Sequence, residues 1–286
     1  MENFNSELYC QEKAVSSGSS FYYSFLFLTP QQRKAIHALY AFCRQVDDIV
    51  DECSDAGVAK IKLEWWRKEI ERVFLGTPQH PIGRALAEVQ QHTPLQKTLF
   101  LEIIQGMEMD LKFQGYQTFD DLRLYCHCVA SCVGLLAAEI FGYQDPRTLE
   151  YARELGLAFQ LVNIIRDVGE DALRGRIYLP EEELQQFQVT SQSILKREYS
   201  ENFRLLMQFQ ATRARHYYQN AKNSLPAGDR LAQASGLIMA DIYFVLLKEI
   251  EKTNFKVLSQ RIALTPLRKF WIAWRSYRNI KKGLMV

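Results

Sequence analysis

The residues of this chain best suited to chemistry form two clusters of carboxylates. The first contains Asp47, Asp48 and Asp51 within an apolar stretch that is expected to be helical. At about 100° per residue, positions four apart lie on one helix face, so Asp47 and Asp51 would point the same way. Taken alone, such a pair is more often a solvated helix face, and Arg44 could simply pair with Asp48.

The second cluster is harder to explain as a solvated surface. Gln160, Asn163, Asp167 and Asp171 recur at helical spacing as a narrow polar stripe, and the residues around them are almost all apolar. Ionised carboxylates are rarely buried without a partner, so a set facing an enclosed space requires cations. Hard oxygen ligands suit Mg²⁺, which commonly joins a few carboxylates to substrate phosphates. Together the two clusters predict a metal–diphosphate site.

Two further segments could contribute to such a site. The serine-rich stretch from Ser16 to Ser20 would suit an anion if it begins a helix, because free N–H groups and the helix dipole favour phosphate. An ordinary serine-rich N-cap is equally consistent. Phe21 and Phe25, four residues apart, would line a cavity or fill the core. The segment from Gly175 to Pro180 either closes over the second cluster or connects two helices.

Composition excludes several classes of protein. The 286 residues are 48% hydrophobic with a formal net charge of only +2, which argues against nucleic-acid binding. The sequence contains no dinucleotide-binding fingerprint, P-loop or nucleophile elbow. No signal peptide and no run of 18 uncharged apolar residues is visible, so we expect a cytoplasmic protein without a spanning helix.

The cysteines and histidines do not suggest a metal centre. Six cysteines are scattered without a framework, and buried small hydrophobes explain them better than a zinc site, although Cys128 and Cys132 could share a helix face. The five histidines show no metal-binding spacing with one another.

Helical patterns dominate the chain, and no series of alternating strands is visible. Thr29-Pro30 and Asp145-Pro146 each resemble an N-cap followed by a first helical residue, while Pro226 and Pro266 open two more helices. A single all-α domain over residues 1–286 is the simplest interpretation. Helices are expected over roughly residues 17–28, 30–53, 58–75, 80–91, 95–113, 118–141, 146–172, 181–187, 192–223, 227–252 and 266–282.

The last of these helices, residues 266–282, mixes basic and aromatic side chains. It could lie on an anionic membrane surface, which would make the protein peripheral on the inner face of the membrane. An exposed helix with buried aromatics is the alternative. Its basic and aromatic residues are Arg268, Lys269, Phe270, Trp271, Trp274, Arg275, Tyr277, Arg278, Lys281 and Lys282.

From about residue 17 to 261 the chain resembles the squalene and phytoene synthases, which join two prenyl diphosphates head to head. The resemblance is carried by Ser20-Phe21, by the run from Tyr40 to Asp51, and by Tyr125-Cys126 with Val129-Ala130-Ser131. The run from Gln160 to Asp171, the segment from Gly175 to Pro180, and Ala214-Arg215 with Tyr217-Tyr218 add to it. Two departures are His127, where a tyrosine is frequent, and Ser17-Gly18.

The resemblance implies the all-α isoprenoid synthase fold, with helices around a central cavity. It implies Mg²⁺, with Mn²⁺ as a substitute, on two opposite walls formed by Asp47, Asp48 and Asp51 and by Asn163, Asp167 and Asp171. The substrate-binding positions would be Ser20, Phe21, Arg44, Gln160, Tyr243 and Arg261. The catalytic positions would be Tyr125, Tyr178 and Arg44.

The run from Ser20 to Leu28 and the Trp65-Trp66-Arg67 triplet look most like bacterial presqualene diphosphate synthases. That resemblance implies condensation of two farnesyl diphosphates to presqualene diphosphate, with release of diphosphate, in squalene or hopanoid synthesis and without NADPH. The bulky residues Phe21, Phe25 and Leu157 would limit cavity depth.

The alternatives are a phytoene synthase using geranylgeranyl diphosphate and a squalene synthase that completes an NADPH-dependent reduction. A non-catalytic membrane-associated protein of this fold should have lost one carboxylate cluster, and this chain has both.

Overall fold

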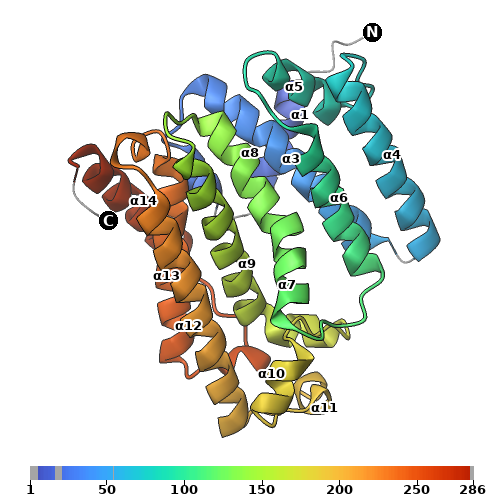
Figure 1. The fold of residues 1–286 in the computed structure, drawn as a ribbon, viewed down its shortest axis with the longest axis vertical. Helices are drawn as coiled ribbons and strands as arrows, with labels where there is room; N and C mark the ends of the chain where they lie inside the picture. Colours follow the sequence, from blue (N-terminus) through green and yellow to red (C-terminus); the bar gives the residue numbers. More distant parts are fainter. Residues whose placement is uncertain (1–5, 17–20, 54, 284–286) are drawn as a thin grey trace.

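The computed structural model describes residues 6–16, 21–53 and 55–283, and within these ranges the chain is helical with no β-strand (Figure 1). The predicted all-α class is therefore confirmed. Ser20 lies outside the described residues.

The α-helices are α1 (Ser6–Ser16), α2 (Phe21–Phe25), α3 (Pro30–Glu52), α4 (Ala56–Phe74), α5 (Pro81–Gln90), α6 (Lys97–Leu111), α7 (Phe119–Cys126), α8 (Cys132–Phe141), α9 (Arg147–Leu173), α10 (Glu181–Gln186), α11 (Ser191–Leu195), α12 (Glu201–Ser224), α13 (Ala234–Lys252) and α14 (Pro266–Lys281). A π turn, η1 (His127–Ser131), joins α7 to α8, and η2 (Ala227–Asp229) and η3 (Lys256–Leu258) are 3₁₀ turns.

Helix α9 is central to the packing. It contacts α8, η1, α12 and α13, and Figure 1 shows it running beside α8 in the middle of the bundle. Two glycines allow this close approach. A Cβ at Gly156 would lie 2.6 Å from the Ala130 carbonyl oxygen, and one at Gly134 would lie 2.5 Å from that of Ala152. Because real Cβ atoms do not approach this closely, a larger side chain at either position would push the walls of the bundle apart.

Two of the predicted helix starts are confirmed. Thr29 caps α3 in a capping box, in which its hydroxyl accepts from the Gln32 N–H and the Gln32 side chain accepts from the Thr29 N–H. The Gln32 amide also donates to the Phe141 carbonyl at 2.9 Å, which ties the start of α3 to the end of α8. Thr265 similarly caps α14, with Pro266 as its first residue.

The start predicted at Asp145-Pro146 lies one residue before the observed one. Helix α9 begins at Arg147 with Pro146 at its N-cap position, and the Asp145 carboxylate accepts from the Arg147 N–H, as a capping side chain does. The start predicted at Pro226 was wrong, because Pro226 precedes only η2 and α13 begins at Ala234. The conformation of Pro226 allows more than one turn type, so the local pattern does not determine the position of the first helical turn there.

Other parts of the helix pattern also differ from the expected ranges. Helix α1 was not predicted. The expected helix 192–223 is two helices, α11 and α12, separated by a turn in which Arg197 has φ 56°. The expected helix 118–141 is interrupted by η1, in which the Cys132 N–H donates to the His127 carbonyl across five residues. The stretch Phe119–Phe141 is long and apolar enough to span a membrane, but 56% of its most apolar window is buried in the bundle, as in a core helix.

Candidate active site

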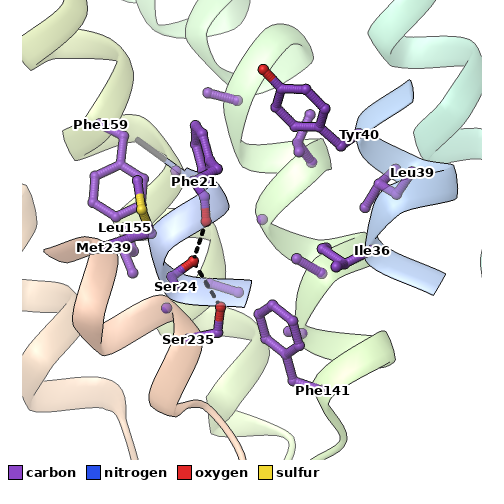
Figure 2. A pocket seen from close by; sticks show the side chains of 18 of the residues that line it. Phe21, Ser24, Ile36, Leu39, Tyr40, Phe141, Leu155, Phe159, Ser235 and Met239 are labelled. Carbon is purple, nitrogen blue, oxygen red and sulfur yellow. Dashed lines mark hydrogen bonds between the residues drawn. The ribbon is translucent and has the colours of Figure 1, made fainter. Parts of the chain in front are cut away.

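An apolar cavity of about 240 Å³ lies among α2, α3, α8, α9 and α13. Figure 2 shows Ile36 and Leu39 from α3, Phe159 from α9 and Met239 from α13 around it. Two of its polar side chains are satisfied locally, since the Ser24 hydroxyl donates to the Phe21 carbonyl at 2.8 Å and the Ser235 hydroxyl donates to Ser24 at 3.0 Å. Most of the other lining residues are apolar. The cavity therefore suits a hydrocarbon chain.

A second, more polar cavity of about 210 Å³ adjoins the first. Arg44, Asp47 and Tyr125 line it, and it shares Tyr40, Cys43, Val129 and Gln160 with the apolar cavity. An elongated ligand with a charged head and an apolar tail would match this arrangement, with its head beside Arg44 and Asp47.

The first carboxylate cluster is held by cations on two sides. Arg44 places Nη1 2.8 Å from Asp47 and Nε 2.8 Å from Asp48, so the predicted pairing of Arg44 with Asp48 is present. Lys13 of α1 adds an ion pair with Asp48 at 3.1 Å. Asp47 thus lines the polar cavity, whereas Asp48 is held beside it by Arg44 and Lys13.

The second cluster lies along α9 and has partners from α9 itself and from other parts of the chain. The Tyr243 hydroxyl donates to Asn163 at 3.1 Å, and the Asn163 amide donates to Gln160 at 3.3 Å. Asp167 forms ion pairs with the neighbouring Arg166 and with Arg261 Nε at 3.1 Å. The structure thus brings five of the predicted site residues together on the α9 side of the site: Gln160, Asn163, Asp167, Tyr243 and Arg261.

The two clusters converge through the turn that follows α9. Asp51, at the end of α3, pairs with Arg174 at 3.1 Å and with Arg176 at 3.6 Å. Burial, together with repulsion from Asp51, raises the pKa of Asp47 to about 6. Burial and the Asp167 charge likewise raise the pKa of Asp171 to about 7. Such carboxylates lack sufficient counter-charge, and their hard oxygen donors fit Mg²⁺.

Sequence reasoning missed Asp110, which lies between the clusters. It is 8% exposed, and its two carboxylate oxygens accept from the Tyr125 hydroxyl at 2.9 Å and the Tyr178 hydroxyl at 2.8 Å. Burial raises its pKa, while the tyrosine hydrogen bonds oppose that rise. One sequence signal was available: Asp110 is a carboxylate in the last turn of the apolar helix α6, where the helix dipole disfavours negative charge.

Asp110 also positions an aromatic wall. The rings of Tyr125 and Tyr178 stack with centroids 5.3 Å apart, Tyr116 lies 5.6 Å from Tyr125, and Phe113 lies 4.9 Å from Tyr178. Because Tyr125 also lines the polar cavity, this wall meets the carboxylates there. Aromatic faces attract cations, so the wall can stabilise positive charge that develops beside it.

Several known proteins are similar to this chain in sequence and in fold. The sequence profile of the squalene/phytoene synthases matches residues 14–268. The chain is 35% identical over 280 residues to the 15-cis-phytoene synthase of Synechocystis sp., covering 93% of this chain and 83% of that protein. It is 36% identical over 270 residues to the chloroplastic phytoene synthase 1 of Arabidopsis thaliana, covering 91% and 63% respectively.

Two solved structures are similar over most of the fold. A dehydrosqualene synthase superposes with a TM-score of 0.86 and 27% identity, covering 97% of both chains. The squalene synthase HpnC of Alicyclobacillus acidocaldarius superposes with a TM-score of 0.79 and 28% identity, covering 87% of this chain and 94% of that one.

Replacement of either Asp47 or Asp167 by alanine is expected to lower prenyltransferase turnover by about 100-fold or more, because charge on a departing diphosphate loses its stabilisation. Steady-state kinetics with prenyl diphosphates, and circular dichroism to confirm helicity, provide the measurement. Asp120→Ala is the matched control, since the Asp120 side chain is 81% exposed and pairs only with Arg123 in the described structure. Near-normal turnover in either cavity variant, or full wild-type activity in EDTA, would contradict the assignment.

The stability of the metal-free protein is expected to fall as pH rises from about 4 to about 7. Asp47 and Asp171 have folded pKa values of about 6 and about 7, above the ordinary value of 3.8, so the folded state binds more protons across this range. Urea denaturation in EDTA at several pH values measures the effect. Asp171→Asn should weaken the pH dependence because it keeps the side-chain shape and removes the charge. If the slope of the unfolding free energy against pH is the same in Asp171→Asn as in the unmodified chain, the raised pKa assigned to Asp171 is contradicted.

Proposed function

The chain belongs to the squalene/phytoene synthase family, and we propose that it joins two molecules of geranylgeranyl diphosphate head to head to form phytoene. The observation that carries the prenyltransferase chemistry is the polar cavity lined by Arg44 and Asp47, which adjoins the apolar cavity. On the same helix as Asp47, Asp51 pairs with Arg174 and Arg176, which follow the carboxylates of α9. The relatives that are 35–36% identical, named phytoene synthases, support the C20 substrate.

Farnesyl diphosphate is the second candidate substrate. It is supported by the sequence resemblance to presqualene diphosphate synthases and by the two structural neighbours, whose names are dehydrosqualene synthase and squalene synthase. The structure weakens one part of the sequence argument for farnesyl diphosphate. Phe21 and Phe25 line the apolar cavity as expected, but the buried Leu157 is not among its lining residues, so it does not limit the cavity directly.

The side chains of the polar cavity would bind the diphosphate head. Mg²⁺ held by Asp47, Asp51, Asn163, Asp167 and Asp171 would neutralise the departing diphosphate. Arg44, Arg174, Arg176 and Arg261 now pair with carboxylates and could turn toward phosphate oxygens when a metal neutralises those carboxylates. Asp48 would then continue to orient Arg44, since it also has Lys13 as a partner.

The remaining steps depend on exclusion of water. Departure of diphosphate leaves an allylic cation, and the apolar lining prevents water from capturing it. The stacked Tyr125 and Tyr178 faces would stabilise the positive charge, with Asp110 fixing both hydroxyls. The double bond of the second chain attacks, and loss of a proton closes a cyclopropane that still carries the second diphosphate. Departure of that diphosphate would open the cyclopropane ring, and loss of a second proton would give the C40 hydrocarbon without a reductant. The released diphosphate would be the proton acceptor.

Incubation of the purified enzyme and Mg²⁺ with geranylgeranyl diphosphate is expected to yield a C40 hydrocarbon. Its kcat/KM should exceed that for farnesyl diphosphate by at least about tenfold, because each additional buried methylene contributes to discrimination. Parallel reactions with each substrate, with and without NADPH, and mass spectrometry of the products test this. C30 products alone would overturn the choice of substrate but leave the head-to-head chemistry, whereas no condensation with either substrate would overturn both.

We also propose that α14 attaches the protein to the inner face of the cytoplasmic membrane. Leu267, Phe270, Trp271 and Trp274 are 83%, 50%, 54% and 43% exposed. Arg275 lies 5.3 Å from the Trp271 ring and Arg278 lies 4.6 Å from the Trp274 ring. The other face of α14 packs inward, where Tyr277 stacks on Phe27 at 4.4 Å. Exposed aromatics beside basic residues suit the interface of an anionic bilayer, into which apolar products would be released.

Substitution of both Trp271 and Trp274 by serine is expected to abolish most co-sedimentation with anionic vesicles and to leave turnover with detergent-dispersed substrate intact. Added salt should weaken binding of the unmodified chain, because each basic residue near the surface contributes about 1 kcal/mol through screened electrostatics. Ile61→Ser, at a 71% exposed position of α4, is the matched control. Equal vesicle binding by the double variant, or none by the unmodified chain at low salt, would contradict attachment.

A further inference from the structure

A compact cluster of one carboxylate, one imidazole and one thiol lies outside the two cavities. It consists of Glu102 on α6, His127 at the start of η1 and Cys132 at the start of α8. Glu102 Oε2 is 3.1 Å from His127 Nε2 and 3.0 Å from Cys132 Sγ, and Cys132 Sγ is 3.6 Å from His127 Nε2. Three different metal-ligating atoms therefore form one triangle.

The π turn is what brings the histidine and the cysteine together. In a regular α-helix, residues five apart are separated by about 140° around the axis, so His127 and Cys132 would not share a face. In η1 the Cys132 N–H bonds to the His127 carbonyl, so five residues complete the turn and the two side chains lie near each other. Single π turns of this kind are frequent at functional sites.

The triangle matches the coordination sphere of Zn²⁺. With Zn–O and Zn–N near 2.0 Å and Zn–S near 2.3 Å, tetrahedral geometry requires ligand atoms roughly 3.3–3.6 Å apart. The three observed separations of 3.0, 3.1 and 3.6 Å need to change by only a few tenths of an ångström. A thiolate and an imidazole also favour Zn²⁺ over Mg²⁺, which prefers oxygen ligands such as those of the aspartate clusters.

The cluster is accessible to an ion from solvent. The Glu102 and His127 side chains are 38% and 35% exposed, whereas Cys132 is buried at the base of the site. Such an arrangement leaves room for a water molecule as a fourth ligand. The opposite side of the same π turn contributes Val129 to both cavities, so the cluster lies behind the cavity wall and not within it.

We propose that Glu102, His127 and Cys132 bind one Zn²⁺ ion, which holds the π turn in place behind the active-site wall. This site is separate from the aspartate clusters and does not depend on the choice of prenyl substrate. The ion would connect α6, η1 and α8 through three bonds in place of the present hydrogen bonds, in which the Cys132 thiol donates to Glu102. Binding would convert that thiol to a thiolate and release its proton to solvent.

Titration of the full chain with Co²⁺ in excess Mg²⁺ is the direct test, because the Mg²⁺ occupies the aspartate clusters and a thiolate–Co²⁺ bond has a distinct charge-transfer band. We expect the band to saturate at one Co²⁺ per chain and to disappear on addition of Zn²⁺. Cys132→Ala should remove the band. His127→Gln, at a position where the side chain is 35% exposed, should weaken binding by at least about tenfold, since even residues supporting a ligand have effects of that size.

Cys126→Ala is the matched control, because Cys126 is a buried cysteine next to His127 but outside the triangle, and this variant should keep the band. Zn²⁺ should also raise the thermal midpoint of the unmodified chain and of Cys126→Ala, but not that of Cys132→Ala. Absence of the band in the unmodified chain, or its persistence in Cys132→Ala, would overturn the proposal.

Discussion

The organisation of this protein depends on one electrostatic constraint, the collection of several carboxylates in one region beside the polar cavity. Asp47, Asp51, Asp110, Asp167 and Asp171 come from three helices, and burial and mutual repulsion disfavour ionisation of Asp47 and Asp171. The cations of the same region offset part of this cost, through Arg44 on α3 and through Arg174 and Arg176 after α9. A site with this much negative charge is suited to divalent metal and, through the metal, to diphosphate.

The bundle satisfies this constraint through the position of α9. That helix carries the second carboxylate cluster on one side and packs closely against η1 and α8 on another, at Gly156 and Gly134. Its polar stripe therefore faces the cavity while its apolar residues remain in the core. The turn after α9 then returns Arg174 and Arg176 to Asp51, so the same segment that closes the helix also links the two clusters.

The neighbouring apolar cavity makes the charged site useful for chemistry. Charge that develops on a substrate near Tyr125 meets aromatic faces and carboxylates and not bulk water. Asp110 connects these features because it holds both tyrosine hydroxyls and also raises the pKa of Asp47 and Asp171 through its own charge. The π turn contributes Val129 to both cavities and places the Glu102–His127–Cys132 cluster behind them. The reactive and supporting sites therefore share one structural element.

The sequence alone determined the all-α class, most helix ranges and the two aspartate clusters, because each depends on spacing along a single helix. The i,i+4 recurrence of Asp47 with Asp51 and of Asn163 with Asp167 and Asp171 specifies a face wherever that helix packs. The helix starts at Thr29 and Pro266 likewise depend on only a few neighbouring residues. The tertiary structure decided what these local patterns could not: the different partners of Asp48 and Asp51, the burial of Asp110, and the position of Leu157 away from the cavity lining. The tertiary structure also decided the π turn, in which a hydrogen bond spans five residues and interrupts the α-helical period on which the sequence interpretation relied. This turn places the His127 and Cys132 side chains next to each other. Each of these depends on a side chain from another helix or on a local departure from regular geometry, and neither leaves a periodic signal in the sequence.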